Sequence, residues 1–441
     1  MSKTVLITNI GLCYRSGTEV VVEQLADGLR RRGHRPILFA PLLGPLAEAM
    51  RARGHLISDK PDGLRIRPDI IHAHHTGPAM AALAAHPGVP ALFVCHDATS
   101  AFDALPNHPR IHHLFAVDER CRARLVDEGA DPVSVQLLPN AVDLSRIPAR
   151  ARLPERPKRA VAVTKHSLHL DALRAACAGA GIEFAAYGFG PDRMIERPEE
   201  LFVQADIVFA TARTALEASA AGAGVVVCDA RGCAGFLTRS NAEAWLAYNL
   251  GAAVLSHPCD IAHVSAAIAA WSPEEATAAS ILVQERRALE TAIDRLETIY
   301  SEMLAAAPRD DVAADAAAVG AFIADWVPHL DQRAPWRRLA EQMADPPLSS
   351  PANAIKNNVT TLARRVDTLA EKADTLAGKV DILAEKVDML AGKVDILASV
   401  PRSLSLRLED MLRGLWRRVL PVRLREPLHR FRRRLLAALL R

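Results

Sequence analysis

The sequence has no apolar run long enough to cross a membrane, no secretory leader and no CxxC pair. A membrane-spanning helix needs about 20 consecutive apolar residues. Without one, a chain that is 50% hydrophobic is expected to be mainly soluble globular protein. The opening residues MSKTVLITNI run directly into a strand-like segment with no cleavage site after it, which argues against secretion. The seven cysteines are scattered and odd in number, which predicts reduced thiols in the cytoplasm.

Lysine is absent from the C-terminal tail, where arginine is abundant. From Pro401 to Arg441 there are twelve Arg and no Lys against three acidic residues, a net charge of +9. The whole chain carries +3, so the first 400 residues together carry −6. The basic character therefore belongs to the tail alone, and it predicts a local acidic surface as the partner of the tail.

Strand-like and helix-like segments alternate through most of the chain, which at 441 residues is long enough for two or three domains. Short apolar runs such as TVLITNI, RPILFA, PDIIHAH and ALFVCHD are separated by helical segments, which predicts a doubly wound, mostly parallel sheet. A proline- and arginine-rich linker at 146–159 precedes a second alternating set with AVAVTK, IEFAAYG, ADIVFAT and GVVVCDA. After a less regular stretch, residues 278–306 are predicted to form one long helix.

These patterns predict an α/β protein with five segments. Residues 1–150 and 151–306 form two Rossmann-like domains, and a ligand-binding cleft is expected between them. Residues 307–357 form a helical linker, 358–399 a coiled coil, and 400–441 an Arg-rich amphipathic helical tail.

A heptad repeat holds without a break from Val359 to Leu397. The a positions are Val359, Val366, Ala373, Val380, Val387 and Val394, and the d positions are Leu362, Leu369, Leu376, Leu383, Leu390 and Leu397. Such a repeat predicts self-association through a rod about 60 Å long at 1.5 Å per residue. Branched Val at a with Leu at d favours a parallel dimer. Since no e/g ion pairs specify the partner, a trimer or folding back on the same chain stays open.

In the tail, residues 401–441, apolar helical stripes lie beside dense arginine. Such helices suit the interface of an anionic bilayer, so we expect the tail to hold the protein at the inner face of the membrane. The alternatives are packing on the rest of the chain and binding to nucleic acid. We expect no nucleic acid, because aromatic residues for base stacking are nearly absent from the tail.

One carboxylate, Glu217, lies in the helical part of the run VFATARTALEASAAGAGVVVCDA, residues 208–230. The flanks are predicted strands, so the helix starts beside the carboxyl end of a strand, where open α/β sheets bind ligands. A lone Glu in an apolar helix is costly to bury unless a polar group meets it. Glu217 therefore either lies on a solvated face or meets a ligand.

Two glycine-containing turns follow predicted strands. In NIGLCYRSGTEVVVEQ, Ser16 and Glu19 fit a capping box, and Gly17 permits close approach of a ligand to the free N–H groups of a helix start. The turn AAYGFGP, residues 185–191, contains Gly188 and Gly190. Each turn alone is a weak signal for a phosphate site.

Together these stretches resemble the GT-B glycosyltransferases, in particular the large retaining family 4. The resemblance is carried by SGTEVVVEQLADGLRRRGHRPILFA, PDIIHAHH, CHD, AVDERCRARLVDEGA and LLPNAVDL, and further on by AYGFGP, ADIVFAT and LEASAAGAGVVVCDA. It covers about residues 3–305 and is more specific in the first half. The end of the predicted long helix, LETIYSEMLAAA, resembles the closing helix of the family, which crosses back to the N-terminal domain.

The resemblance implies a nucleotide-sugar donor bound mainly by the second domain and an acceptor bound mainly by the first. Glu217 matches the family Glu whose carboxylate accepts hydrogen bonds from the donor ribose. Lys165 and Arg213 lie where a cation would stabilise charge on the leaving diphosphate. Gly17 and Thr18 resemble the loop that approaches the same phosphates.

His96, in CHD, resembles the cleft histidine near the donor sugar, and Gly188 and Gly190 are expected in the donor site. The donor site is also divergent. Phe209 stands where the family has an earlier Glu, and the loop between DIVFAT and LEA is shortened. A domain that has lost its chemistry therefore stays an alternative.

Neither a metal nor a cofactor is expected besides the donor substrate. His72 and His74 would share one face of a strand, as in a metal site, but no Asp, Glu or Cys cluster joins them. The resemblance also implies a histidine-containing strand there without metal, and the absence of a D-x-D motif disfavours the metal-dependent GT-A type. Glu19, Glu23 and Asp118 are expected to be solvated or to cap helices.

The predicted function is transfer of a sugar from a nucleotide-diphosphate sugar to a glycan, such as a growing polysaccharide, or to a lipid-linked acceptor, with retention of configuration. A cytoplasmic enzyme held at the membrane surface would gain avidity from several weak contacts joined by a coiled coil. The alternatives are a catalytically degenerate GT-B domain that serves as a coiled-coil scaffold or binding protein, and a nucleotide-sugar epimerase.

Overall fold

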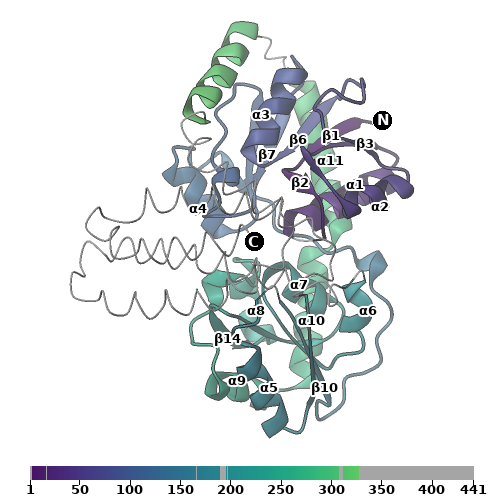
Figure 1. Ribbon diagram of the computed structural model, residues 1–441, viewed down its shortest axis with the longest axis vertical. Coiled ribbons are helices and arrows are strands. Elements are labelled where there is room, and N and C mark those ends of the chain that lie inside the picture. Colours follow the sequence, from purple (N-terminus) through teal and green to yellow (C-terminus); the bar gives the residue numbers. More distant parts are fainter. Residues whose placement is uncertain are drawn as a thin grey trace, which may run out of the picture. The chain divides into compact units, whose positions relative to one another are not determined.

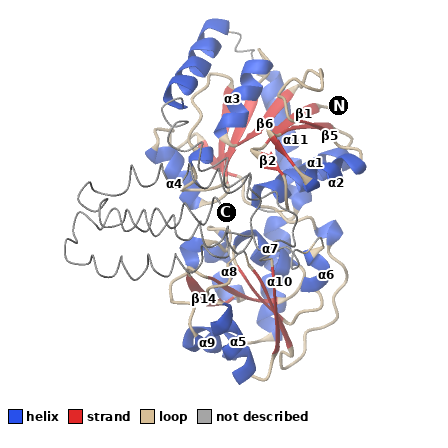
Figure 2. Cartoon of the chain, in the orientation of Figure 1, coloured by secondary structure: helices blue, strands red, loops and turns tan. Residues whose placement is uncertain are grey.

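The computed structural model describes residues 2–15, 17–164, 166–188, 195, 197–306 and 311–326 (Figure 1). The predicted coiled coil and basic tail lie outside the described residues. The described chain contains two separate open sheets, each flanked by helices (Figure 2).

The first sheet has seven strands in the order β5-β3-β1-β6-β7-β8-β9, and all neighbouring strands are parallel. The strands are β1 (Thr4–Thr8), β3 (Arg35–Phe39), β5 (Leu56–Ser58), β6 (Ile70–His74), β7 (Ala91–Cys95), β8 (Ile111–Ala116) and β9 (Val135–Leu137). Every residue of β6 and β7 is buried, as expected for central parallel strands covered on both faces. The Val, Ile and Leu runs of the sequence therefore form the centre of this sheet.

Helices connect these strands and cover the sheet. They are α1 (Gly17–Arg31), α2 (Pro45–Ala52), α3 (Thr76–Ala85) and α4 (Glu119–Asp127), with short 3-10 turns at Ala101–Asp103 and Leu144–Arg146. A small parallel pair, β2 (Gly11–Leu12) with β4 (Leu42–Leu43), lies beyond the ends of β1 and β3. The predicted capping role of Asp118 is confirmed, since its side chain accepts a hydrogen bond from the Cys121 N–H at the start of α4.

The second sheet has five strands in the order β11-β10-β12-β13-β14, parallel except for the last. The strands are β10 (Arg159–Val163), β11 (Glu183–Tyr187), β12 (Ile207–Ala210), β13 (Gly224–Asp229) and β14 (Gly232–Phe236). The helices are α5 (Leu170–Gly179), α6 (Pro198–Phe202), α7 (Ala212–Ala220), α8 (Arg239–Leu246), α9 (Ile261–Ala269), α10 (Pro273–Arg287) and α11 (Leu289–Ala305), with a 3-10 turn at Ala252–Val254. One apolar cluster lies on each face of this sheet. The predicted α/β class with two Rossmann-like units is confirmed.

Two sequence predictions about this half were wrong. The stretch between the predicted strand at 224–230 and the long helix is regular, since it contains β14, α8 and α9. The long helix is also broken, because Ala288 is extended, with ψ of 131°. Val142 forms a short parallel bridge there: its N–H donates to the Arg287 carbonyl, and its carbonyl accepts from the Leu289 N–H. These bonds replace helical ones, so α10 ends and α11 begins in a new direction.

Helix α11 packs in the core of the first half, although the elements that precede it in the chain, β10 to α10, belong to the second half (Figure 1). Ile293, Leu296 and Tyr300 are buried there. A further helix at 312–326, within the predicted helical linker, adds Phe322 to the same core, and its Asp315 pairs with Arg110 at 2.7 Å. The chain thus crosses from the second half back to the first, as the resemblance implied.

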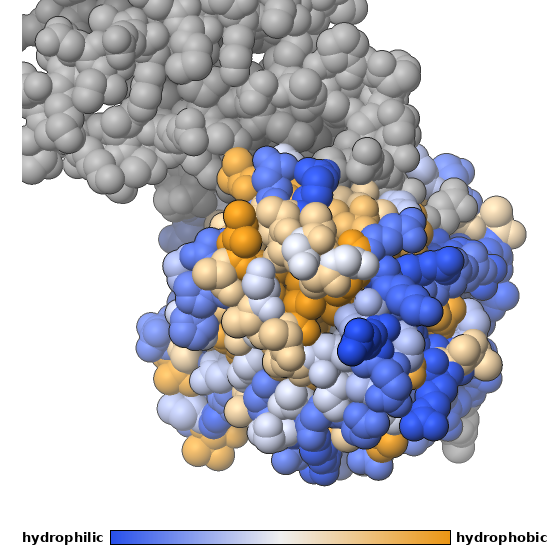
Figure 3. All heavy atoms as spheres, turned by 90° about the horizontal axis from the view of Figure 1, so that it is seen from below, coloured by the Kyte–Doolittle hydropathy of each residue, from blue (hydrophilic) through white to orange (hydrophobic). Residues whose placement is uncertain are grey.

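The surface at the end of the second half, where α5 and α9 lie, mixes hydrophilic and hydrophobic areas (Figure 3). The exposed large apolar side chains of this half include Leu168 and Ile261. None of the helices in the described ranges is both long and apolar enough to cross a bilayer.

Candidate functional site

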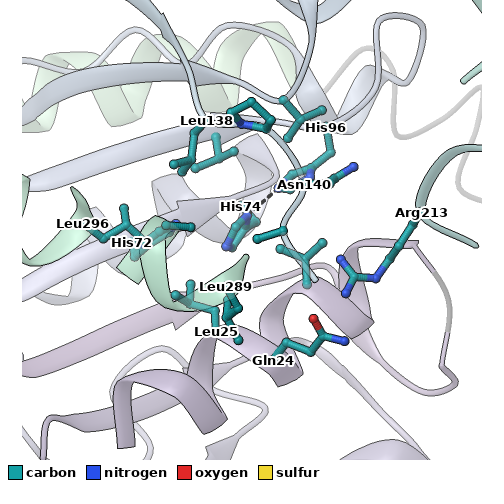
Figure 4. Close-up of a pocket in the computed structure, with 16 residues that line it drawn as sticks. Gln24, Leu25, His72, His74, His96, Leu138, Asn140, Arg213, Leu289 and Leu296 are labelled. Carbon is teal, nitrogen blue, oxygen red and sulfur yellow. Dashed lines mark hydrogen bonds between the residues drawn. The ribbon is translucent and has the colours of Figure 1, made fainter. Parts of the chain in front are cut away.

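Polar side chains from both halves meet around one cavity at the carboxyl ends of parallel strands (Figure 4). His72 and His74 lie at the end of β6, and His96 directly follows β7. Gln24 comes from α1 and Arg213 from the first turn of α7. The carboxyl edge is where open α/β sheets bind ligands, so strand order alone brings these groups together.

The start of α7 is built by an unusually short turn. Only Thr211 separates β12 from α7, and Ala212 adopts a left-handed conformation with φ of 52°. The Ala212 N–H is held by the Leu250 carbonyl at 2.8 Å. The turn is short, as the sequence led us to expect. Phe209, at the position of the missing family Glu, is a buried residue inside β12.

Glu217 is neither solvated nor isolated. Its Oε1 lies 3.0 Å from the Arg213 guanidinium, one helical turn away, and accepts a hydrogen bond of 3.3 Å from Gln24 Nε2. Both contacts fall on the same oxygen. The Arg213 side chain is 10% exposed and that of Glu217 is 17% exposed, so the pair is largely shielded from solvent. The question left open by the sequence is answered in part: the carboxylate meets polar groups of both halves.

Three of the residues that line the cavity are histidines in contact with one another. His74 Nδ1 and His96 Nε2 share a hydrogen bond of 2.6 Å. The rings of His72 and His74 stack with centroids 4.8 Å apart, which confirms that they share one face of the strand. His72 Nδ1 in turn bonds the Tyr300 hydroxyl of α11 at 2.6 Å. Thus α11 holds His72 through Tyr300, and it also lines the cavity directly with Leu289, Ala292 and Leu296.

These histidines are held in the neutral form. Burial lowers the pKa of His72 to about 3. Burial also lowers the pKa of His74 and His96 well below the ordinary value, helped by the neighbouring histidines and, for His96, by Arg213. A neutral imidazole carries one N–H and one free nitrogen, so each ring can donate one hydrogen bond and accept one.

The backbone of His96 is held by the carboxyl group of Asp103. Its N–H donates to Asp103 Oδ1 at 2.7 Å. Asp103 is 1% exposed, and burial raises the pKa of its carboxyl to about 7. Asp103 therefore positions the start of the loop after β7.

Several buried polar atoms around the cavity have no hydrogen-bond partner within the described chain. They are Gln24 Oε1, His72 Nε2, His74 Nε2, Asn140 Oδ1 and Arg213 Nε; Arg213 Nη2 makes no hydrogen bond either, but it forms the ion pair with Glu217. Buried polar atoms are normally paired, so this concentration of open donors and acceptors fits a polar ligand. The cavity measures about 50 Å³, room for a few waters rather than a nucleotide sugar.

The remaining predicted site residues are placed as follows. Gly17 and Thr18 form the first turn of α1, on the helix that carries Gln24, but neither lines the cavity. Gly188 has φ of +86°, and a Cβ there would lie 2.9 Å from the Thr164 carbonyl oxygen, so the turn requires glycine. Lys165 and Gly190 lie outside the described residues.

Sequence reasoning missed Gln24, Asn140 and the role of Glu23. Glu23 is 1% exposed and pairs with Arg15 at 2.9 Å and Arg53 at 2.6 Å, so the expectation of a solvated or capping residue was wrong. Arg146, from the linker before the second half, lies 4.0 Å from the same carboxylate. The three arginines are visible in the sequence, but which carboxylate they contact depends on the tertiary structure.

Among the residues that the structure describes, no group of three or more His, Cys, Asp or Glu side chains is arranged to hold a metal ion. The histidines of the cavity are bonded to one another and to Tyr300 instead.

Residues 62–146 match the model of Glycosyltransferase Family 4. The match confirms the resemblance for this part of the first half, which includes β6, β7 and the segment with Asn140. A search of curated proteins found no match.

Solved structures similar to this chain include a glycosyltransferase from Rickettsia africae ESF-5, with 14% identity and a TM-score of 0.49 over 69% of this chain and 100% of that one. Anabaena HepE in complex with UDP has 12% identity and a TM-score of 0.48 over 68% of this chain and 100% of its own. A UDP-N-acetylglucosamine 2-epimerase has 13% identity and a TM-score of 0.42 over 67% of this chain and 95% of its own. Because these TM-scores lie below 0.5, the functional assignment rests on the family match and on the residues of the site.

Proposed function

We propose that this protein is a glycosyltransferase that moves a sugar from a nucleotide-diphosphate sugar to a glycan or lipid-linked acceptor, with retention of configuration. The observation that carries the proposal is that Arg213, Gln24 and the neutral His96 line one cavity, and that Glu217 of α7 contacts both Arg213 and Gln24. The glycosyltransferase match of residues 62–146 supports it independently.

Glu217 binds the donor ribose in this proposal. Its Oε1 is occupied by Arg213 and Gln24, which leaves Oε2 to accept a hydrogen bond from a ribose hydroxyl. Since the cavity is too small for the donor, Gln24 and Glu217 must part for the nucleotide to enter. The Gln24 amide is then free to bond a sugar or acceptor hydroxyl.

Arg213 and the start of α7 face the diphosphate. A guanidinium and the N–H groups of a helix start both stabilise the negative charge that develops when the glycosidic bond breaks. The Thr211 side chain makes no capping hydrogen bond, so it does not occupy these N–H groups. Gly17, Thr18 and Gly188 form close-approach turns for the phosphates, and Lys165 and Gly190 keep their sequence-predicted roles there.

His96 contacts the donor sugar. Because it is neutral, it can hydrogen-bond a sugar hydroxyl without competing with Arg213 for the phosphate charge. Its 2.6 Å bond to His74 fixes the orientation of the ring.

Calorimetric titration of the full chain with UDP and GDP tests the donor site. We expect one nucleotide to bind and Glu217→Ala to weaken it about tenfold or more, about 1.4 kcal/mol. Glu285→Ala, which removes an exposed carboxylate from α10, is the matched control and should leave binding unchanged. Equal affinities of wild type and Glu217→Ala would contradict the assigned role of Glu217.

A nucleotide-binding protein without transferase activity is the second candidate. The observation that favours it is the one-residue turn before α7 with Phe209 buried in β12, which leaves no loop to carry the earlier family carboxylate. Product formation from radiolabelled UDP-sugars and a glycan acceptor separates the two candidates. Nucleotide binding without turnover on any donor would favour the binding protein.

We further propose that residues 359–397 associate into a coiled coil and that residues 401–441 bind an anionic membrane surface. Light scattering after size exclusion should show an oligomer for the full chain and a monomer for residues 1–326. Flotation with phosphatidylglycerol vesicles should retain the full chain only. A monomeric full chain that stays unbound would refute both assignments.

A further inference from the structure

Three thiols meet at the antiparallel edge of the second sheet, away from the cavity residues. Cys228 lies near the end of β13 and its direct partner across the strand pair is Cys233 of β14. The side chains of Cys233 and Cys259 are both close enough to the Cys228 thiol to raise its pKa. Cys228 and Cys233 are each 1% exposed, whereas Cys259, before α9, is half-buried.

The strand register places Cys228 and Cys233 at disulfide distance. The Cys233 N–H donates to the His257 carbonyl at 2.7 Å, and its carbonyl accepts from the His257 N–H at 3.0 Å. Both peptide groups of Cys233 therefore point away from β13, which makes Cys228 and Cys233 a non-hydrogen-bonded pair. The Cα atoms of such pairs are about 4.5 Å apart, within the range of about 4.4–6.8 Å found across disulfides.

The three thiols differ in reactivity. The hydrogen bond from Cys228, with the Gly235 N–H and nearby His263, lowers the pKa of Cys233 to about 7, so a substantial part is thiolate near neutral pH. Hydrogen bonds to its neighbours and burial raise the pKa of Cys228, which stays a thiol. Cys228 is thus the common neighbour of the half-buried Cys259 and of the buried Cys233, whose pKa is lowered.

We propose that Cys259, Cys228 and Cys233 form a reversible oxidation site for hydroperoxides. The Cys259 sulfur attacks the peroxide and becomes a sulfenic acid, and the peroxide leaves as an alcohol or water. The Cys228 sulfur then displaces water from it to form the Cys228–Cys259 disulfide. Finally the Cys233 thiolate attacks Cys228, which yields the buried Cys228–Cys233 disulfide and releases Cys259 as a thiol. One peroxide is reduced and two thiols are oxidised.

The hairpin of β13 and β14 is hydrogen-bonded to the turn before α7, so its oxidation state can affect the start of that helix. Asp229, next to Cys228, accepts a hydrogen bond of 3.0 Å from the Thr211 hydroxyl before α7. A disulfide at Cys228 therefore fixes the strand end to which the Thr211 turn is bonded.

Peptide mapping of the full chain tests the site, because trypsin places the three cysteines in separate peptides, residues 214–231, 232–239 and 240–286. Reduced protein is treated with hydrogen peroxide, blocked with N-ethylmaleimide under denaturing conditions and digested without reductant. We expect the 214–231 and 232–239 peptides to become disulfide-linked and dithiothreitol to reverse the link. Cys259→Ser should slow that link by about tenfold, since the remaining two thiols are buried.

A control variant and a control pair of cysteines accompany the test. Cys177→Ser removes a buried thiol of α5 outside the cluster and should leave the rate unchanged. Cys95 and Cys121 are also neighbours, but both are buried without a half-buried third thiol, so they should stay unlinked. Three fully alkylated cluster cysteines after peroxide would overturn the proposal. An unchanged rate in Cys259→Ser would overturn the assigned order.

Discussion

Replacing His72 with Gln should make the stability of the protein less sensitive to acid. His72 is 1% exposed, and burial lowers its pKa from 6.5 to about 3. Below pH 6.5 the unfolded chain binds a proton at this site that the folded chain refuses. Protonation therefore favours unfolding, and the stability present above pH 6.5 is lost as the pH falls toward 3.

The magnitude follows from proton linkage. One site that is protonated only in the unfolded state changes the free energy of unfolding by about 1.4 kcal/mol per pH unit. Between pH 6.5 and 5.0 His72 should therefore account for about 2 kcal/mol of lost stability. His74 and His96 act in the same direction. Asp103 opposes them, because its pKa is raised to about 7 and its contribution to stability is lost as the pH rises. The difference between wild type and variant isolates the His72 contribution.

Urea unfolding followed by circular dichroism at several pH values between 7.5 and 5.0 measures the effect. His72→Gln keeps an acceptor for the Tyr300 hydroxyl. Because it replaces a buried side chain, the variant should still be less stable at pH 7.5, but its free energy of unfolding should change less with pH. His166→Gln, at an exposed histidine, is the matched control and should keep the wild-type profile. If the wild-type and His72→Gln profiles run parallel, His72 is protonated equally in both states and the argument from burial is wrong.

Three further substitutions test the packing around the site. Glu23→Gln removes a buried charge that holds two arginines, so urea unfolding should show a loss of about 3–5 kcal/mol; an unchanged midpoint would mean that the arginines find other partners. Gly188→Ala forces a Cβ to 2.9 Å from the Thr164 carbonyl at positive φ, and thermal unfolding should show a loss of about 1–3 kcal/mol, whereas an unchanged melting temperature would exclude strain at that turn. Gln24→Ala frees the Glu217 carboxylate, so calorimetry with UDP or GDP, which carry no sugar for Gln24 to bond, should show tighter binding by about 0.5–1.5 kcal/mol; weaker binding would mean that Gln24 binds the nucleotide itself.

The sequence by itself determined the elements and the class of the fold. Apolar runs of strand length and helical periods depend on neighbours a few residues away, so the alternation that predicts two Rossmann-like units is legible locally. The same local pattern placed Glu217 on a helix between two strands, and the resemblance, drawn over about residues 3–305, includes the segment 62–146 that matches Glycosyltransferase Family 4. The heptads at 359–397 are equally local and stay a prediction.

The tertiary structure alone decided which polar groups meet. Gln24 and Glu217 are 193 residues apart, and His74 ends β6 whereas His96 follows β7. The break at Ala288 was also invisible, because its cause is a pair of hydrogen bonds to distant Val142 rather than a helix-breaking residue. Periodicity records how each segment buries its own side chains, whereas contacts between segments depend on strand order and on the packing of the two halves. For that reason the sequence showed the carboxylate and the neighbouring Arg213, but only the fold showed that Gln24 meets them.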